Sequence, residues 1–122
     1  MEKIIVSKFG GTSMGDAACM LRSAEVSVKQ KSRLIVVSAT SGTTNQLIEL
    51  GSQAQSQKQA EVERLLLGIR ERHFQIAKDL KASTQTHEFL QSVLDELDSL
   101  ARGIFLLRDC SPKALDNLMS FG

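Results

Sequence analysis

A glycine turn between an apolar run and a helical pattern constrains this chain more than any other feature. The run Lys8-Phe9-Gly10-Gly11-Thr12-Ser13 follows Ile4-Ile5-Val6 and precedes a segment with helical periodicity. Adjacent glycines let the backbone approach a phosphate and point amide N–H groups at it. Lys8 adds a full positive charge, and the N-terminus of the following helix a partial one. The pattern predicts an anion-binding turn; a tight turn that a lysine merely precedes is the alternative for Lys-x-Gly-Gly alone.

A second apolar run, Leu34-Ile35-Val36-Val37, leads into a loop rich in hydroxyl and amide side chains, residues 38–45. Both apolar runs are continuous rather than alternating, which is typical of strands that are covered on both faces of a parallel sheet. We therefore expect strands at residues 3–7 and 34–37, joined by a helix in a right-handed βαβ unit. Loops that follow neighbouring parallel strands leave the same edge of the sheet, where ligands bind in open α/β folds.

The remaining pattern is helical. Ser13 and Asp16 are spaced as a capping box for the first helix, and Thr43 is the expected cap of the helix after the second strand. Residues 57–81 and 86–107 have apolar side chains at helical spacing and a short polar turn between them, which predicts an antiparallel hairpin. Ser111-Pro112 predicts the start of a last helix. The apolar stripes favour core packing, with a partner-binding face as the alternative. The first helix has its expected stripe at Ala17, Met20, Leu21, Ala24 and Val28.

Composition excludes several classes of protein. The 122 residues are 42% apolar and 24% charged with a net charge of +1, which is typical of a globular domain and does not favour nucleic acid as a partner. No apolar run is long enough for a membrane span. Cys19 and Cys110 are expected to be reduced thiols in a cytoplasmic protein, and His73 and His87 to lie on a solvated surface. Their spacing predicts no metal site.

Three segments together resemble the N-terminal region of aspartate kinases, members of the amino acid kinase superfamily. These segments are residues 6–13, residues 36–39 and residues 42–45. The resemblance covers most of residues 3–50, and beyond them it is a matter of pattern. It implies an α/β fold: the N-terminal part of an amino acid kinase fold, with a parallel βαβ unit followed by a long helical hairpin. Residues 1–122 would then be a truncated kinase domain, without the nucleotide-binding half and the regulatory domains.

The resemblance also implies a reaction: the γ-phosphoryl group of ATP passes to the side-chain carboxylate of L-aspartate, giving 4-phospho-L-aspartate. This is the first step of lysine, threonine and methionine biosynthesis. By match to the family motif, Lys8 would be catalytic, while Ser38 and Thr44 would bind L-aspartate. The carboxylate nucleophile is already ionised at neutral pH, so no general base is required. Mg²⁺ would enter with ATP, without a protein metal site. The expected ATP-binding residues are Lys8, Gly10, Gly11, Thr12 and Ser13.

The full-length protein would be a cytoplasmic homo-oligomer, with or without a fused homoserine dehydrogenase, and the 122 residues alone would be inactive. Two alternatives stay open. One is a kinase of the same superfamily that acts on another acidic substrate. The other is a non-catalytic interaction fragment, in which the glycine turn binds an anion and the helical hairpin binds a partner.

Overall fold

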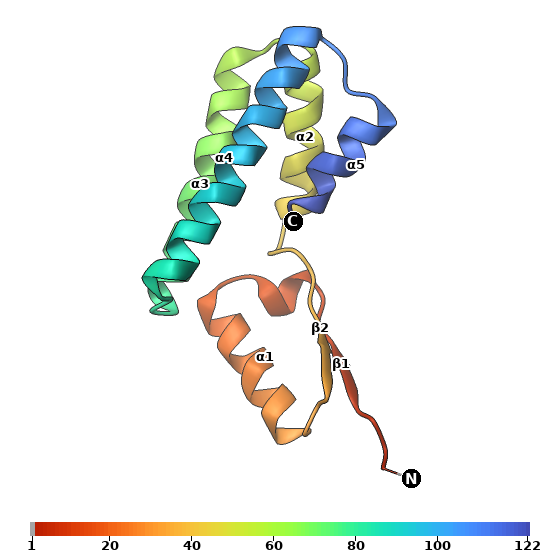
Figure 1. Cartoon of the computed structure of the whole chain (residues 1–122), viewed down its shortest axis with the longest axis vertical. Helices are drawn as coiled ribbons and strands as arrows, with labels where there is room; N and C mark the ends of the chain where they lie inside the picture. Colours follow the sequence, from red (N-terminus) through yellow and green to blue (C-terminus); the bar gives the residue numbers. More distant parts are fainter. Residues whose placement is uncertain (1) are drawn as a thin grey trace. The chain divides into compact units, whose positions relative to one another are not determined.

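The computed structural model describes residues 2–122, which form two compact units (Figure 1). The first ends at Gly42 and contains β1 (Val6–Lys8), the 3₁₀ helix η1 (Gly11–Met14), α1 (Ala17–Lys29) and β2 (Leu34–Val36). The second extends from Thr43 to Gly122 and contains α2 (Thr43–Gln55), α3 (Gln59–Asp79), α4 (Thr84–Leu107) and α5 (Pro112–Ser120). The predicted α/β class, with a parallel βαβ unit and a long helical hairpin, is confirmed.

The two strands pair in parallel, with Val6 opposite Leu34 and Lys8 opposite Val36. The Phe9 amide continues the ladder by donating to the Val36 carbonyl at 2.9 Å. The first strand starts later than predicted, at Val6 rather than at residue 3. At its start the Ile5 carbonyl accepts from the Arg33 amide at 2.9 Å, so the chain is already beside β2 before regular pairing begins.

The prediction that both faces of the sheet are buried is wrong for the described residues. A sheet of two strands with one helix cannot cover both of its faces, and both strands are edges. An open groove of about 250 Å³, lined among others by Met20, Ile35 and Val37, separates α1 from β2. In and beside the two strands, the apolar side chains that are exposed by 37% to 69% are Ile4, Ile5, Val6, Leu34, Ile35, Val36 and Val37.

Helix α1 begins differently from the prediction. Its cap is Asp16, whose side chain accepts from the Cys19 amide at 2.8 Å, and not Ser13, which lies inside η1. The capping box fails because Gly11–Met14 forms a helical turn of its own before the chain can enter α1. The first helix therefore starts after Asp16.

The buried face of α1 also differs from the predicted stripe. Leu21, Ala24 and Val28 are exposed, whereas Ser23 and Ser27 are buried. The serines tolerate burial because each hydroxyl has an acceptor: Ser23 Oγ donates to the Ser13 carbonyl and Ser27 Oγ to the Ser23 carbonyl, both at 2.9 Å. The Ser23 bond connects α1 to η1, and so to the glycine turn, whereas the Ser27 bond lies within α1.

The second unit is a helical bundle in which α2 contacts α3, α4 and α5 (Figure 1). The predicted hairpin is present as α3 and α4, and α4 starts two residues early because Ser83 accepts from the Thr86 amide at 3.2 Å. Helix α5 starts as predicted, with Ser111 as cap and Pro112 in the first turn. The largest fully buried side chains are Leu47, Leu50, Leu97 and Leu118. Within residues 2–122, no helix has the length and apolarity that crossing a membrane requires.

Both histidines are half-buried, contrary to the prediction of a solvated surface. His73 Nδ1 lies 2.7 Å from the Ile69 carbonyl one turn earlier on α3. The His87 ring stacks on Phe74, with 6.2 Å between ring centroids, because the hairpin brings the end of α3 beside the start of α4. This cross-helix pairing depends on tertiary structure and leaves no local pattern in the sequence.

Gly51 lets α5 approach α2 closely, and its substitution tests this contact. A Cβ at Gly51 would lie 2.9 Å from Leu118 Cδ1 and 3.2 Å from Cys110 Sγ, whereas one at Gly68 on α3 would meet nothing within 4 Å. We expect Gly68→Ala to stabilise the chain by roughly 0.5–1 kcal/mol through helix propensity. We expect Gly51→Ala to lower the free energy of unfolding overall, because overpacking at this contact costs about 1–3 kcal/mol and outweighs the gain in helix propensity. Urea unfolding of the two variants checks this, and an equal gain in both would contradict the contact.

Candidate functional site

The glycine turn presents three amide groups that the protein itself does not use. Gly10 is extended, with φ −84° and ψ −179°, and η1 follows it directly. The Ser13 amide donates to the Gly10 carbonyl at 3.1 Å. Within residues 2–122, the amides of Gly10, Gly11 and Thr12 have no acceptor. Three consecutive unpaired N–H groups form a concave donor surface of the kind that binds phosphate oxygens.

The loop after β2 lies against this turn. A Cβ at Gly11 would stand 3.8 Å from both Ser38 Oγ and the Ala39 carbonyl, and 3.7 Å from Ser41 Cα. Ser38 is exposed, and its hydroxyl donates to the Ala39 carbonyl at 3.0 Å. The predicted juxtaposition of the two strand-end loops is therefore present for Ser38, which lies beside Gly11.

Lys8 is exposed at the end of β1, directly before the turn. Lys8 pairs with Val36 in the parallel sheet, so the strand fixes its Cα, and its side chain is exposed. None of the ion pairs among residues 2–122 includes Lys8. Its ammonium group is therefore available to an anionic ligand.

The N-terminus of α1 does not contribute to the site as predicted. The Asp16 carboxylate occupies it, and the hydrogen bond from the Cys19 backbone amide, followed by one from the Cys19 side chain, holds the pKa of Asp16 below its ordinary value. A negative charge there would repel a second anion. The candidate anion site therefore consists of Lys8 and the turn amides, without the dipole of α1.

Thr44 belongs to the second unit. Gly42, with φ 80°, ends the first unit in a conformation that favours glycine, and α2 begins directly at Thr43. Thr43 therefore lies in the first helical turn rather than at the predicted cap. Thr43 is only 2% exposed whereas Thr44 is exposed, so the hydroxyl of Thr44 is the one that a ligand can reach.

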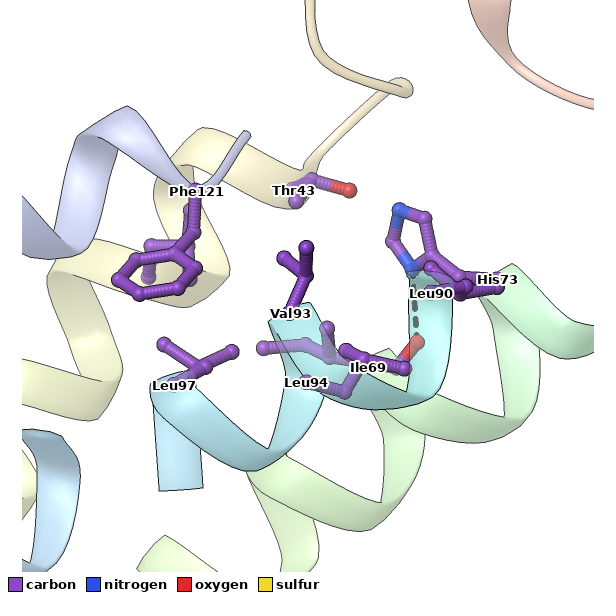
Figure 2. A pocket seen from close by; sticks show the side chains of 9 residues that line it. Thr43, Ile69, His73, Leu90, Val93, Leu94, Leu97 and Phe121 are labelled. Carbon is purple, nitrogen blue, oxygen red and sulfur yellow. Dashed lines mark hydrogen bonds between the residues drawn. The ribbon is translucent and has the colours of Figure 1, made fainter. Parts of the chain in front are cut away.

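A small cavity of about 40 Å³ lies behind this first turn of α2 (Figure 2). Figure 2 shows Phe121 on one side of it and His73 on the other, with Thr43 between them. Sequence reasoning missed this cavity, although the spacing of the α4 residues indicated one apolar face. Its lining residues are Thr43, Leu47, Ile69, His73, Leu90, Val93, Leu94, Leu97 and Phe121.

Sequence reasoning also missed a second cation near the turn. A groove of about 290 Å³ in the first unit is lined by Thr12 and Ser13 together with Arg22, whose Nη2 donates to Cys19 Sγ at 3.3 Å. Arg22 lies in the second turn of α1. In the sequence, it could not be distinguished from an ordinary solvated arginine on a helix. Within the described residues, no group of three or more His, Cys, Asp and Glu side chains could hold a metal ion.

Comparison with known proteins identifies relatives along the whole chain. The model of the amino acid kinase family matches residues 3–119. Lysine-sensitive aspartokinase 3 of Escherichia coli K12 is 36% identical, over 100% of this chain and 26% of that protein. Aspartokinase 1, chloroplastic, of Arabidopsis thaliana is 33% identical, over 96% of this chain and 21% of that protein. The crystal structure of E. coli aspartokinase III with aspartate and ADP superposes with a TM-score of 0.88 at 36% identity, over 98% of this chain and 26% of that one. The chain thus spans about a quarter of the length of these relatives.

The cap of α1 gives a prediction with a defined sign. Because the pKa of Asp16 is lowered from 3.8, its carboxylate stabilises α1 at higher pH, and this contribution is lost as pH falls below 3.8 through the folded-state pKa. We expect the Cys19 amide proton shift in NMR to titrate with an apparent pKa below 3.8. In Asp16→Asn, which keeps an acceptor oxygen, the titration should disappear. A midpoint at or above 3.8 would contradict the assignment.

Proposed function

This chain belongs to the amino acid kinase family, and from that premise we propose that it is the N-terminal part of the kinase domain of an aspartokinase. The reaction is transfer of the γ-phosphoryl group of ATP to the side-chain carboxylate of L-aspartate. The observation that carries the proposal is the turn at Gly10 and Gly11, with its unpaired amides, beside the unpaired ammonium of Lys8. The aspartokinase relatives, one of them solved with aspartate and ADP, support the choice of substrates.

Lys8 and the turn would hold the phosphates of ATP. Phosphoryl transfer depends chiefly on positioning and on offsetting negative charge, which fixed amides and a cation supply without covalent chemistry. The amides of Gly10, Gly11 and Thr12 are oriented before any ligand binds, because β1 and η1 fix the turn on both sides. The Ser13 amide is already used within η1, so Ser13 would act through its hydroxyl.

Ser38 and Thr44 would bind L-aspartate through their hydroxyl groups. Ser38 lies beside Gly11, so a carboxylate bound at Ser38 would be next to the turn amides that would donate hydrogen bonds to the phosphates. Both hydroxyls are exposed and neutral, which suits a substrate that already carries two carboxylates. No general base is assigned, since the attacking carboxylate is ionised at neutral pH.

Further properties of the full-length protein are part of the same proposal. It would act in the cytoplasm, in the biosynthesis of lysine, threonine and methionine, and it would assemble as a homo-oligomer. Mg²⁺ would enter with the nucleotide. No step is assigned to the metal ion.

Removal of the Lys8 charge tests the function directly. In the full-length protein, we expect ADP release that depends on L-aspartate, and we expect Lys8→Ala to reduce kcat by roughly 100-fold or more because the charge on the transferring group is no longer offset. Lys3→Ala, which removes an exposed lysine that precedes β1, is the matched control and should retain activity. A coupled ADP assay with L-aspartate, L-glutamate or neither measures both.

The outcomes of this assay separate the candidate functions. Release with L-glutamate in place of L-aspartate would keep the family and change the substrate. No ADP release with either amino acid would refute the assignment as a kinase of an acidic amino acid. Full activity in Lys8→Ala would refute the role of the lysine.

A substitution at Ser38 tests the substrate assignment separately. We expect Ser38→Ala to raise the KM for L-aspartate by about 10-fold, as for loss of one hydrogen bond to a charged group, with the KM for ATP changed less than about twofold. Ser32→Ala is the control, because it removes a hydroxyl of the same unit that bonds Ser7 and not the glycine turn. Equal changes in both KM values would argue against a role of Ser38 in aspartate binding. Steady-state kinetics with each substrate varied in turn provide the measurement.

A further inference from the structure

We propose that Phe121 is a positioning residue for the first turn of α2, and through it for the Thr44 hydroxyl. This inference rests on the proposed function, in which Thr44 binds the substrate amino acid. It adds a residue far along the chain from the strand-end loops to the determinants of substrate affinity. The role is one of packing and not of contact with the substrate.

The first turn of α2 depends on side-chain packing. The first four amide groups of a helix have no acceptor within the helix, so its end is held by caps and by neighbouring side chains. In α2 the inward side chains are Thr43, 2% exposed, and Leu47, 1% exposed. Thr44 points outward from the same turn and is exposed. Its position is therefore set by how well Thr43 and Leu47 pack.

The packing beneath this turn is incomplete, and Phe121 limits the gap. Thr43, Leu47 and Phe121 line one cavity of about 40 Å³, whose other walls come from α3 and α4 (Figure 2). Of the side chains that line it, Phe121 is the only one from the α5 end of the chain. Loss of its ring would enlarge the existing void directly behind Thr43, and a void removes packing contacts from every side chain that lines it.

Phe121 is half-buried against the core and directly follows a helix that is packed on α2. Leu118, one turn earlier, is fully buried against α2 at Gly51. The Phe121 amide donates to the Leu118 carbonyl at 3.2 Å, so the backbone of α5 extends to the aromatic residue. Helix α5 is thus packed against the interior of α2 at Gly51, and Phe121 lines the cavity beside the first turn of α2.

Amide hydrogen exchange in the 122-residue chain tests the structural part. In a helix that begins at Thr43, the amides of Leu47 and Ile48 donate to the carbonyls of Thr43 and Thr44. We expect Phe121→Ala to accelerate their exchange about 10-fold or more, because the first turn opens more often. Phe89→Ala is the matched control: Phe89 lies on α4, is 71% exposed, and should leave these amides within about twofold of wild type.

Two results would overturn the inference at this stage. One is unchanged exchange at Leu47 and Ile48. The other is an equal acceleration at the buried Leu65 and Leu66 of α3, which would indicate loss of global stability instead of local opening. If Phe121→Ala does not fold, Phe121→Leu provides the same comparison, with a smaller acceleration confined to Leu47 and Ile48 as the expected result.

Kinetics in the full-length protein test the functional part. We expect Phe121→Ala to raise the KM for L-aspartate about 10-fold, while kcat and the KM for ATP stay within about twofold of the wild-type values. We expect Phe121→Leu to retain most of the wild-type affinity for L-aspartate. A parallel rise in both KM values, or no change in either, would overturn the inference. If the wild-type protein releases no ADP with L-aspartate, the proposed function fails, and the exchange measurement alone decides the role of Phe121.

Discussion

The hydrogen bond from the Phe9 amide to the Val36 carbonyl, at 2.9 Å, continues the parallel ladder at the edge where the candidate site lies. Parallel pairing of Lys8 with Val36 makes both strands end at the same level, so the glycine turn and the Ser38 loop leave the sheet side by side. A slip of one residue would reverse the faces of the paired side chains and separate Gly11 from Ser38. The turn amides and the Ser38 loop are thus juxtaposed by backbone register, before any side chain contributes.

The two units differ in how strongly their own packing holds them. The second has Leu47, Leu50, Leu97 and Leu118 fully buried, and its helices are mutually covered. The first has two edge strands with exposed apolar side chains, and an open groove between α1 and β2. Short sheets of this kind are weakly stable by themselves. The hydrogen bond from Ser23 on α1 to the Ser13 carbonyl of η1 is therefore important, because it attaches the glycine turn to the helix in a region with little core.

Features encoded by neighbouring residues could be predicted from the sequence. The continuous apolar runs predicted parallel strands, the Ser111-Pro112 pair predicted the start of α5, and the glycine turn was recognised with its lysine. Features decided by competition or by distant contacts could not. The capping box predicted Ser13 as the α1 cap, but the 3₁₀ turn includes Ser13, and the cap is Asp16. The burial of Ser23 and the stacking of His87 on Phe74 depend on partners far along the chain. Among the proposed site residues, Lys8 and Ser38 came from local motifs, whereas the cavity behind Thr43 required the assembled bundle.

The proposed phosphoryl transfer favours a lysine rather than an arginine at the position before the turn. An arginine would form a fixed, planar pair of hydrogen bonds, whereas a lysine ammonium on a flexible stem can follow a phosphoryl group as its charge moves from donor to acceptor. Such a cation is effective only if the protein does not neutralise it. The nearest acidic residue along the chain after the turn, Asp16, is already engaged by the Cys19 amide at the start of α1. As the N-cap of α1, the Asp16 carboxylate offsets the helix dipole there. Lys8 is then the principal positive charge beside the three free amides.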